Sequence, residues 1–488
     1  MINFIRHDYV LVVVLLLAGL GLNIFLTAYT TFWIDESMVV NLSYESNSRI
    51  ISELLTKEAH PPVYYFLIKV TRIIFGDREL YFRLLSSLFF ILTGFYIYLF
   101  GREIGGRPSG LIALVLWSSN YFLLFYSKQA RPYSLLAFLS IASAYYLGVL
   151  LKNYRTKYAV YYIIITVLGL YTNYWFILLV LAQFIVLFII KEKNIKVWSA
   201  LIGAGLLFMP WAIIYLLKFN NYGIGQWIDR PGLASIGESF GYFGWGQWLI
   251  IIPGIIGGVI GAIINNNLDF KKLWLLIIYF LITIGLAFSV SQFVPIYTPG
   301  RREIVLAPIF IITLAYLFSR IESRKWQIGI STLLVLFTFQ AISDFNVQAK
   351  EWQSSDLSVI KEIKNEIKSG DYIILYGLTN TNYNYYSRRL GMNNDRIYFP
   401  AGMEFNQNSL GPIQEISSDP DKLKTDIQML KEKINGVEHA NFFVLITDDA
   451  ASAALVTSLD GNLKKIKEII PQVPHMPTWI NRVMVYEK

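Results

Sequence analysis

Residues 9–37 read YVLVVVLLLAGLGLNIFLTAYTTFWIDES, and residues 9–29 carry no charged side chain. A bilayer core about 30 Å thick is crossed by about 20 apolar residues in a helix, so this segment is predicted to span a membrane. Its apolar core is longer than that of a secretory signal peptide, and no small-residue cleavage site follows, so we expect a retained span. The adjacent carboxylates Asp35 and Glu36 come directly after it, where they are costly unless they lie in a polar cavity.

Further apolar segments follow along the chain. They are residues 80–100, 108–126, 132–151, 158–173, 174–190, 197–217, 247–265, 272–290, 303–319 and 326–343. The sequence therefore predicts a multi-pass, all-α membrane region over residues 1–343, with about eleven transmembrane helices. Composition agrees, because the 488 residues are 55% hydrophobic and only 16% charged, with a mean hydropathy of +0.47. The absence of cysteine excludes disulfides, thiolate metal sites and cysteine nucleophiles.

The distribution of charge predicts the orientation. Residues 1–343 hold 26 basic and 15 acidic residues, whereas residues 344–488 hold 16 and 19. Alternate connections between spans are short and basic, as cytoplasmic loops are. Their basic residues are Arg102, Arg107, Lys152, Arg155, Lys157, Lys191, Lys193, Lys196, Lys271, Lys272, Arg320, Arg324 and Lys325. We therefore expect a cell-membrane protein with a cytoplasmic N-terminus and external loops 30–79 and 218–246. Basic residues between apolar spans suit anionic lipid headgroups, and nucleic acid is a poor explanation for them.

Residues 344–488 have a different character. Tyr372 to Tyr376 and Asn441 to Thr447 are apolar runs typical of buried strands, and residues 354–368 have the pattern of an amphipathic helix. Leu463 to Ile470 is interpreted as another helix. Alternating helices and strands predict a small soluble α/β domain over residues 344–488, which the charge bias places on the extracytoplasmic side of the membrane.

The first external loop, residues 30–79, is too long for a simple connector. Its apolar positions near residues 50–55 predict a short helix along the membrane interface. Asp35 and Glu36 are candidate catalytic carboxylates, or acids that cap and begin a helix. His60, just before two prolines, is either a ligand or a histidine that caps a turn.

Two groups of basic residues depart from the charge bias, since they lie on the predicted external side. Lys128 and Arg131 precede the fourth span, and Arg301 and Arg302 precede the tenth. They are either long side chains that anchor the helices at the interface or a cationic pocket for a phosphate. We favour the pocket, because both groups fall on the same side as Asp35 and Glu36.

Several classes of mechanism are excluded. The sequence contains no GxxxxGK[ST], HExxH or GxSxG motif, which argues against nucleotide-driven motors and the corresponding proteases and hydrolases. Charges in the middle of spans, expected of an ion-coupled transporter, are scarce. Besides an enzyme, a transporter or flippase for a lipid-linked glycan and a non-catalytic assembly subunit remain as alternatives. Asp35 discriminates among them, because a scaffold should tolerate its replacement.

The order of several short motifs resembles that of the GT-C fold glycosyltransferases that use polyprenyl-phosphate sugars. The resemblance is to the protein mannosyltransferase-like, glycosyltransferase family 39-type enzymes and to the aminoarabinose transferases. It covers about residues 1–190, with a weaker likeness at Arg301-Arg302. The matching motifs are Asp35-Glu36, His60-Pro61-Pro62, Arg83-Leu84-Leu85-Ser86, Ala130-Arg131-Pro132-Tyr133 and Tyr171-Thr172-Asn173-Tyr174.

The resemblance implies transfer of a sugar from a polyprenyl-phosphate donor to a hydroxyl of a protein, lipid or glycan, on the outer face and with inversion. Asp35 would be the general base, and Glu36 would orient the acceptor or help to hold a metal. The implied substrate-binding residues are His60, Lys128, Arg131, Tyr133, Asn173, Arg301 and Arg302. A divalent metal at Glu58 and His60 is left open, because the sequence has Asn173 where relatives often have histidine and no histidine in loop 218–246.

The orientation can be tested by labelling, because the chain has no cysteine of its own. Cysteines introduced at Ser46 and Ser369 should react with a membrane-impermeant thiol reagent in intact cells, whereas one at Asn194, in a basic loop, should not. Labelling at position 194 without labelling at position 46 would invert the orientation.

Overall fold

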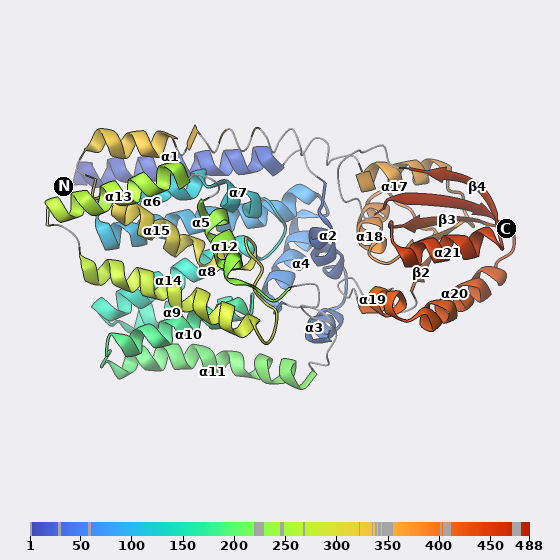
Figure 1. Cartoon of the computed structure of the whole chain (residues 1–488), viewed down its shortest axis with the longest axis horizontal. Coiled ribbons are helices and arrows are strands. Elements are labelled where there is room, and N and C mark those ends of the chain that lie inside the picture. Colours follow the sequence, from blue (N-terminus) through green and yellow to red (C-terminus); the bar gives the residue numbers. More distant parts are fainter. Residues whose placement is uncertain are drawn as a thin grey trace.

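The structure is a computed structural model. It describes residues 2–27, 31–56, 60–218, 229–244, 248–266, 269–321, 323–333, 335, 336, 339, 343, 355–400, 403, 411–470 and 480–488. Apolar helices lie side by side in one part of the molecule, and a sheet covered by helices forms the other (Figure 1).

Four of the described helices have the length and composition to cross a membrane. They are α5 (Glu79–Gly105), α8 (Tyr133–Lys152), α11 (Ile195–Lys218) and α14 (Phe270–Ser291). Two bent pairs raise the number to six if each pair is one span: α6 (Arg107–Ser119) with α7 (Tyr121–Ser127), and α12 (Leu233–Gly244) with α13 (Trp248–Ile264). Shorter apolar stretches lie in α1 (Ile2–Thr27), α9 (Thr156–Leu170), α10 (Trp175–Ile189) and α15 (Ala307–Phe318). Every predicted span up to residue 319 coincides with one of these helices or pairs, which confirms a multi-pass, all-α membrane region. The number of about eleven transmembrane helices stays a prediction.

Two predicted spans differ from continuous helices, and a third is only partly described. The span 108–126 is bent by 62° at Asn120, whose side chain accepts a hydrogen bond from the Leu123 N–H at 3.1 Å and thereby caps α7. The span 303–319 begins with a turn of 3-10 helix, η1 (Arg302–Val305), before α15. Residues 324–333 are helical, and much of the rest of the predicted span 326–343 lies outside the described residues.

The first predicted external loop folds into three short helices, α2 (Ile34–Leu42), α3 (Asn47–Thr56) and α4 (Val63–Phe75). Helix α3 buries Ile50, Leu54 and Leu55 on one side, so the predicted amphipathic helix is confirmed. In Figure 1 these helices lie at the end of the helical bundle that faces the sheet.

The C-terminal unit runs from α17 to β5 and has a five-stranded sheet in the order β2-β1-β3-β5-β4. Its elements are α17 (Ser355–Glu366), β1 (Tyr372–Tyr376), α18 (Thr379–Arg389), β2 (Asp395–Phe399), α19 (Gly411–Ser418), α20 (Pro420–Asn435), β3 (Asn441–Ile446), α21 (Ala450–Asp460), β4 (Lys464–Ile469) and β5 (Arg482–Glu487). Strand β1 pairs in parallel with β2 and β3, and β5 is antiparallel to β3 and β4. Successive β1 side chains face opposite sides: Ile373 joins the cluster that includes α17 and α18, and Ile374 joins that of α20 and α21. The predicted α/β fold and its two apolar strands are therefore confirmed.

The interpretation of Leu463 to Ile470 as a helix is wrong, because residues 464–469 form strand β4. The spacing of its isoleucines imitates a helix, since a β-bulge between Lys465 and Lys467 breaks the alternation expected of a strand. β4 is an edge strand, and its lysines suit that position because they oppose pairing with another chain. The conformation of residues 464–469 is decided by their backbone hydrogen bonds to β5, and the local spacing of apolar residues does not reveal this pairing.

Candidate active site

Helix α2 presents its two acidic residues in different directions. Trp33 is the N-cap residue, and Asp35 and Glu36 lie in the first turn, where acids interact favourably with the helix dipole. Consecutive residues point about 100° apart around a helix, so the two carboxylates have different neighbouring residues. The Trp33 N–H donates to Glu36 Oε2 at 2.9 Å, so the helix-capping role considered for these acids applies to Glu36.

Glu36 forms a buried ion pair with Arg83 of α5. The Arg83 Nε donates to Glu36 Oε1 at 2.8 Å, and Nη2 donates to Oε2 at 2.7 Å, while both residues are at most 3% exposed. The Ala130 N–H also donates to Oε1, at 2.7 Å. A second donation from Arg83 Nη2, to the Thr31 carbonyl at 2.8 Å, holds the chain that enters α2. This carboxylate therefore joins α2, α5 and the segment before α8.

Asp35 faces two arginines from distant parts of the sequence. Its Oδ2 is ion-paired with Arg301 and lies 3.8 Å from Arg131 Nη2. Arg131 Nη1 donates to the Asp35 carbonyl at 3.2 Å, and Arg301 Nε donates to the Tyr133 hydroxyl at 2.7 Å. The Asp35 side chain is 19% exposed, so it stays accessible, unlike Glu36. The structure thus brings together four of the predicted site residues: Asp35, Arg131, Tyr133 and Arg301.

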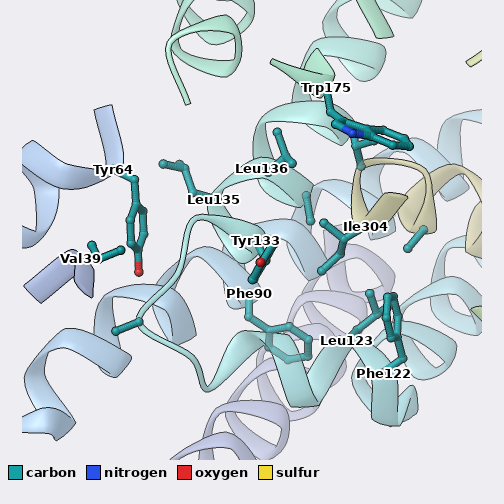
Figure 2. Packing of buried hydrophobic residues seen from close by; sticks show 14 of the residues in the cluster. Val39, Tyr64, Phe90, Phe122, Leu123, Tyr133, Leu135, Leu136, Trp175 and Ile304 are labelled. Carbon is teal, nitrogen blue, oxygen red and sulfur yellow. The ribbon is translucent and has the colours of Figure 1, made fainter. Parts of the chain in front are cut away.

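The start of α8 positions Arg131 and Tyr133. Pro132 is the N-cap residue and Tyr133 the first residue of the helix, so Arg131 lies just before the helix N-terminus, as the proline predicts. The Tyr133 ring is fully buried and contacts Tyr126 edge-on with 4.8 Å between ring centroids. Figure 2 shows Tyr133 between Tyr64 and Val39 on one side and Ile304 on the other. Apolar packing therefore fixes the ring whose hydroxyl contacts Arg301.

A tight turn before η1 positions Arg301. Gly300 has φ +71°, and a Cβ there would lie 2.5 Å from the Tyr242 ring, so only glycine fits. The Arg301 N–H donates to Glu303 Oε2 at 3.2 Å, and the Ser239 hydroxyl donates to Glu303 Oε1 at 2.7 Å. Burial, with the charge of Arg302, lowers the pKa of Arg301 to about 10, which leaves it cationic at neutral pH. Sequence reasoning missed this support by Glu303 and Ser239, although an acid directly after two arginines was a signal.

The other predicted site residues have different neighbours. Lys128, the C-cap residue of α7, is buried with its Nζ 5.5 Å from the centre of the Phe125 ring, and burial together with the Arg83 charge lowers its pKa well below the ordinary range. Arg302 Nη1 donates to the Ile296 carbonyl at 3.4 Å. Asn173 is buried in the turn between α9 and α10, where its Oδ1 accepts the Trp175 N–H at 2.9 Å and its Nδ2 has no hydrogen-bond partner within the described residues.

The proposed metal ligands are only partly described. His60 is buried just before α4, and Glu58 lies outside the described residues. Across the described part of the chain, no three histidine, aspartate or glutamate side chains cluster as metal ligands would. His60 is thus the one described member of the predicted pair, and one imidazole does not form a site.

The helical bundle with its sheet unit has the GT-C fold of membrane glycosyltransferases. The structure is similar to ArnT from Cupriavidus metallidurans in the apo state (TM-score 0.68) and bound to undecaprenyl phosphate (TM-score 0.63), each at 12% identity and covering 97% of both chains. It is also similar to an oligosaccharyltransferase from Archaeoglobus fulgidus tethered with an acceptor peptide (TM-score 0.54, 11% identity), over 93% of this chain and 71% of that one. Residues 59–214 match the sequence model of the family described as dolichyl-phosphate-mannose-protein mannosyltransferase. No curated protein matches the chain in sequence.

The Glu36–Arg83 pair should be essential for folding. In Glu36→Gln, the Arg83 charge stays buried without its counter-charge, which typically costs about 3–5 kcal/mol. We expect a lower melting temperature in detergent and less folded protein. The control is Glu103→Gln, which removes an exposed ion pair with Lys152, of a kind worth about 0–1 kcal/mol. Equal melting temperatures for the two variants would contradict this role.

Proposed function

We propose that this protein is a membrane glycosyltransferase that moves a sugar from a polyprenyl-phosphate donor to an acceptor hydroxyl at the outer face of the membrane, with inversion at the anomeric carbon. The observation that carries the proposal is the Asp35 carboxylate, partly accessible and facing Arg131 and Arg301 in a chain with the GT-C fold. A carboxylate beside fixed cations supplies the two groups that this reaction needs.

The reaction has a simple balance. Asp35 takes the proton from the acceptor hydroxyl, whose oxygen attacks the anomeric carbon. The bond from that carbon to the phosphate oxygen breaks, and polyprenyl phosphate leaves with the bonding electrons. Arg131 and Arg301 stabilise the charge that develops on the phosphate, because guanidinium groups bind phosphate oxygens in pairs. Attack from the side opposite the phosphate inverts the anomeric configuration.

The same arginines account for the resting state. Before the donor binds, the Asp35 carboxylate is their anionic partner. The donor is a phosphodiester, which like the carboxylate carries one negative charge on two oxygens, so it can replace Asp35 as the partner of the guanidinium groups and free the carboxylate to accept a proton. Donor binding therefore precedes activation of the base.

Two observations support a lipid-linked donor: the donors available at the outer face of a membrane and an apolar groove in the helical bundle. Nucleotide sugars are made in the cytosol and do not cross membranes unaided, whereas a lipid-phosphate sugar that has been moved outward is available at the surface. An apolar groove of about 470 Å³, bounded by α1, α6 and the side chains of Val335 and Phe339, has room for part of an isoprenoid chain. It is lined by residues such as Leu15, Leu22, Phe25 and Val115. The similar ArnT structure with bound undecaprenyl phosphate supports the same class of ligand.

The remaining predicted residues take supporting parts in this proposal. Glu36 positions α2 and does not transfer the proton, because its oxygens are already hydrogen-bonded to Arg83 and two backbone N–H groups. Lys128, Arg302, His60 and Asn173 are assigned to substrate binding around the central four residues. A divalent metal at Glu58 and His60 is a separate proposal from the resemblance, and no step above depends on it.

Replacing Asp35, the proposed general base, tests the proton-transfer step of the mechanism. Asp35→Asn keeps the shape of the side chain but removes the basic oxygen, so turnover should fall by about 10²–10⁴-fold. The melting temperature should change far less than in Glu36→Gln, because Asp35 is partly exposed. The measurement is release of free polyprenyl phosphate from the lipid donor. Full turnover in the variant would remove Asp35 as the base.

Arg131 distinguishes a phosphate ligand from an interfacial anchor. Lysine anchors a helix about as well as arginine but cannot make the paired contact to phosphate, so Arg131→Lys should lower turnover substantially at saturating acceptor while membrane insertion persists. Arg320→Lys is the matched control, since Arg320 follows the C-terminus of α15 and donates to the carbonyl of Gly105, the last residue of α5, at 3.3 Å. If Arg131→Lys and Arg131→Ala both match the wild type, Arg131 is an anchor.

A further inference from the structure

Helix α18 of the C-terminal unit packs directly against α2, the helix that carries Asp35 (Figure 1). Ile34 and Met38 of α2 form an apolar cluster with Leu378 and Met403 of the C-terminal unit. Ile34, Met38 and Asn41 are spaced by four and three residues, so they lie along one side of α2. The Glu36 side of the same helix faces Arg83, and Asp35 faces Arg131 and Arg301. Each side of α2 therefore has its own neighbour.

Hydrogen bonds from α18 hold both ends of α2. At its beginning, the Phe32 N–H donates to the Tyr386 hydroxyl oxygen at 2.8 Å. At its end, Asn41 Nδ2 donates to the Thr381 carbonyl at 2.8 Å, and Arg388 Nη1 donates to Asn41 Oδ1 at 3.3 Å. Contacts at two ends and along one side fix both the rotation and the position of a helix.

The same helix α18 is fastened to the start of α5, which carries Arg83. Arg389 is ion-paired with Glu79, the first residue of α5, and the Tyr385 hydroxyl donates to the Asp77 carbonyl at 2.8 Å. The Tyr385 ring also lies against Phe32, with 4.8 Å between centroids. Helices α2, α5 and α18 therefore form one frame around the Glu36–Arg83 pair.

The sequences of the two helices show why the frame is needed. Helix α2 has nine residues, which is below the length at which isolated helices are stable in water. Helix α18 reads TNTNYNYYSRR, and its Thr, Asn and Tyr residues are weak helix formers. Residues 379–387 are nevertheless all buried, so contacts with surrounding elements hold this helix together. Neither helix owes its position to local preference.

We propose that the C-terminal unit builds the active site from outside the membrane region, with Tyr386 as a positioning residue for the base. Tyr386 acts through the Phe32 N–H, three residues before Asp35, and does not touch the reacting atoms. Losing this bond lets the first turn of α2 shift, and a displacement of about 1 Å can cost about 100-fold in rate. The inference rests on the proposed function, because it assigns Asp35 as the base.

A pair of matched variants tests the proposal. Tyr386→Phe removes the acceptor for the Phe32 N–H and keeps the ring. Tyr383→Phe, on the same helix, removes a fully buried hydroxyl that has no hydrogen-bond partner within the described residues. The comparison is made in the full-length protein through two measurements: kcat and KM with the lipid donor, and amide hydrogen exchange over residues 34–42.

For Tyr386→Phe we expect kcat to fall by about tenfold or more with the donor KM within about twofold, since orientation and not binding is lost. Exchange in α2 should become about tenfold faster, as expected for the loss of one buried hydrogen bond. Tyr383→Phe should match the wild type in both. If either kcat or exchange in Tyr386→Phe stays at the Tyr383→Phe value, the proposal is overturned. A wild-type protein that releases no polyprenyl phosphate would instead overturn the proposed function, and the exchange comparison alone would then decide whether α18 holds α2.

Discussion

Glu36 and Arg83 form a buried ion pair at the point where α2, α5 and the segment before α8 meet. A charge removed from water must be paired and hydrogen-bonded, so this pair admits few alternative arrangements. Once Glu36 is directed toward Arg83, the helix geometry of α2 turns Asp35 toward Arg131 and Arg301. The buried Glu36 carboxylate thus determines the direction in which the accessible Asp35 carboxylate points.

The sequence was informative wherever the physics is local. Long apolar segments, the amphipathic pattern of α3 and the apolar run of β1 each predicted an element that the structure contains. Pro132 also predicted where α8 begins. These signals depend on residues close together in the chain, and the membrane restricts the choice further because backbone groups in lipid must be hydrogen-bonded internally.

Individual contacts between distant residues were not predictable, although the sequence did predict that Asp35, Arg131 and Arg301 belong to one site. The ion pair of Asp35 with Arg301 joins residues 266 positions apart, and no pattern around either residue selects the other. Glu36 and not Asp35 is buried because it pairs with Arg83, and the sequence showed Arg83 only as part of a motif, without indicating its partner. The strand β4 was mistaken for a helix because its pairing with β5 outweighs its spacing of isoleucines. The hydrogen bond from Phe32 to Tyr386 crosses 354 positions and likewise had no sequence signal.

The central claim is that a polyprenyl-phosphate sugar is the donor. It is tested most directly by incubating the purified wild-type protein with a panel of polyprenyl-phosphate monosaccharides and, separately, with the matching nucleotide sugars. Each incubation includes a membrane extract that contains lipids, glycans and proteins as acceptors. The account predicts that at least one lipid donor yields free polyprenyl phosphate together with a glycosylated acceptor, and that the nucleotide sugars yield neither. Transfer from a nucleotide sugar, or no release from any lipid donor, would contradict it.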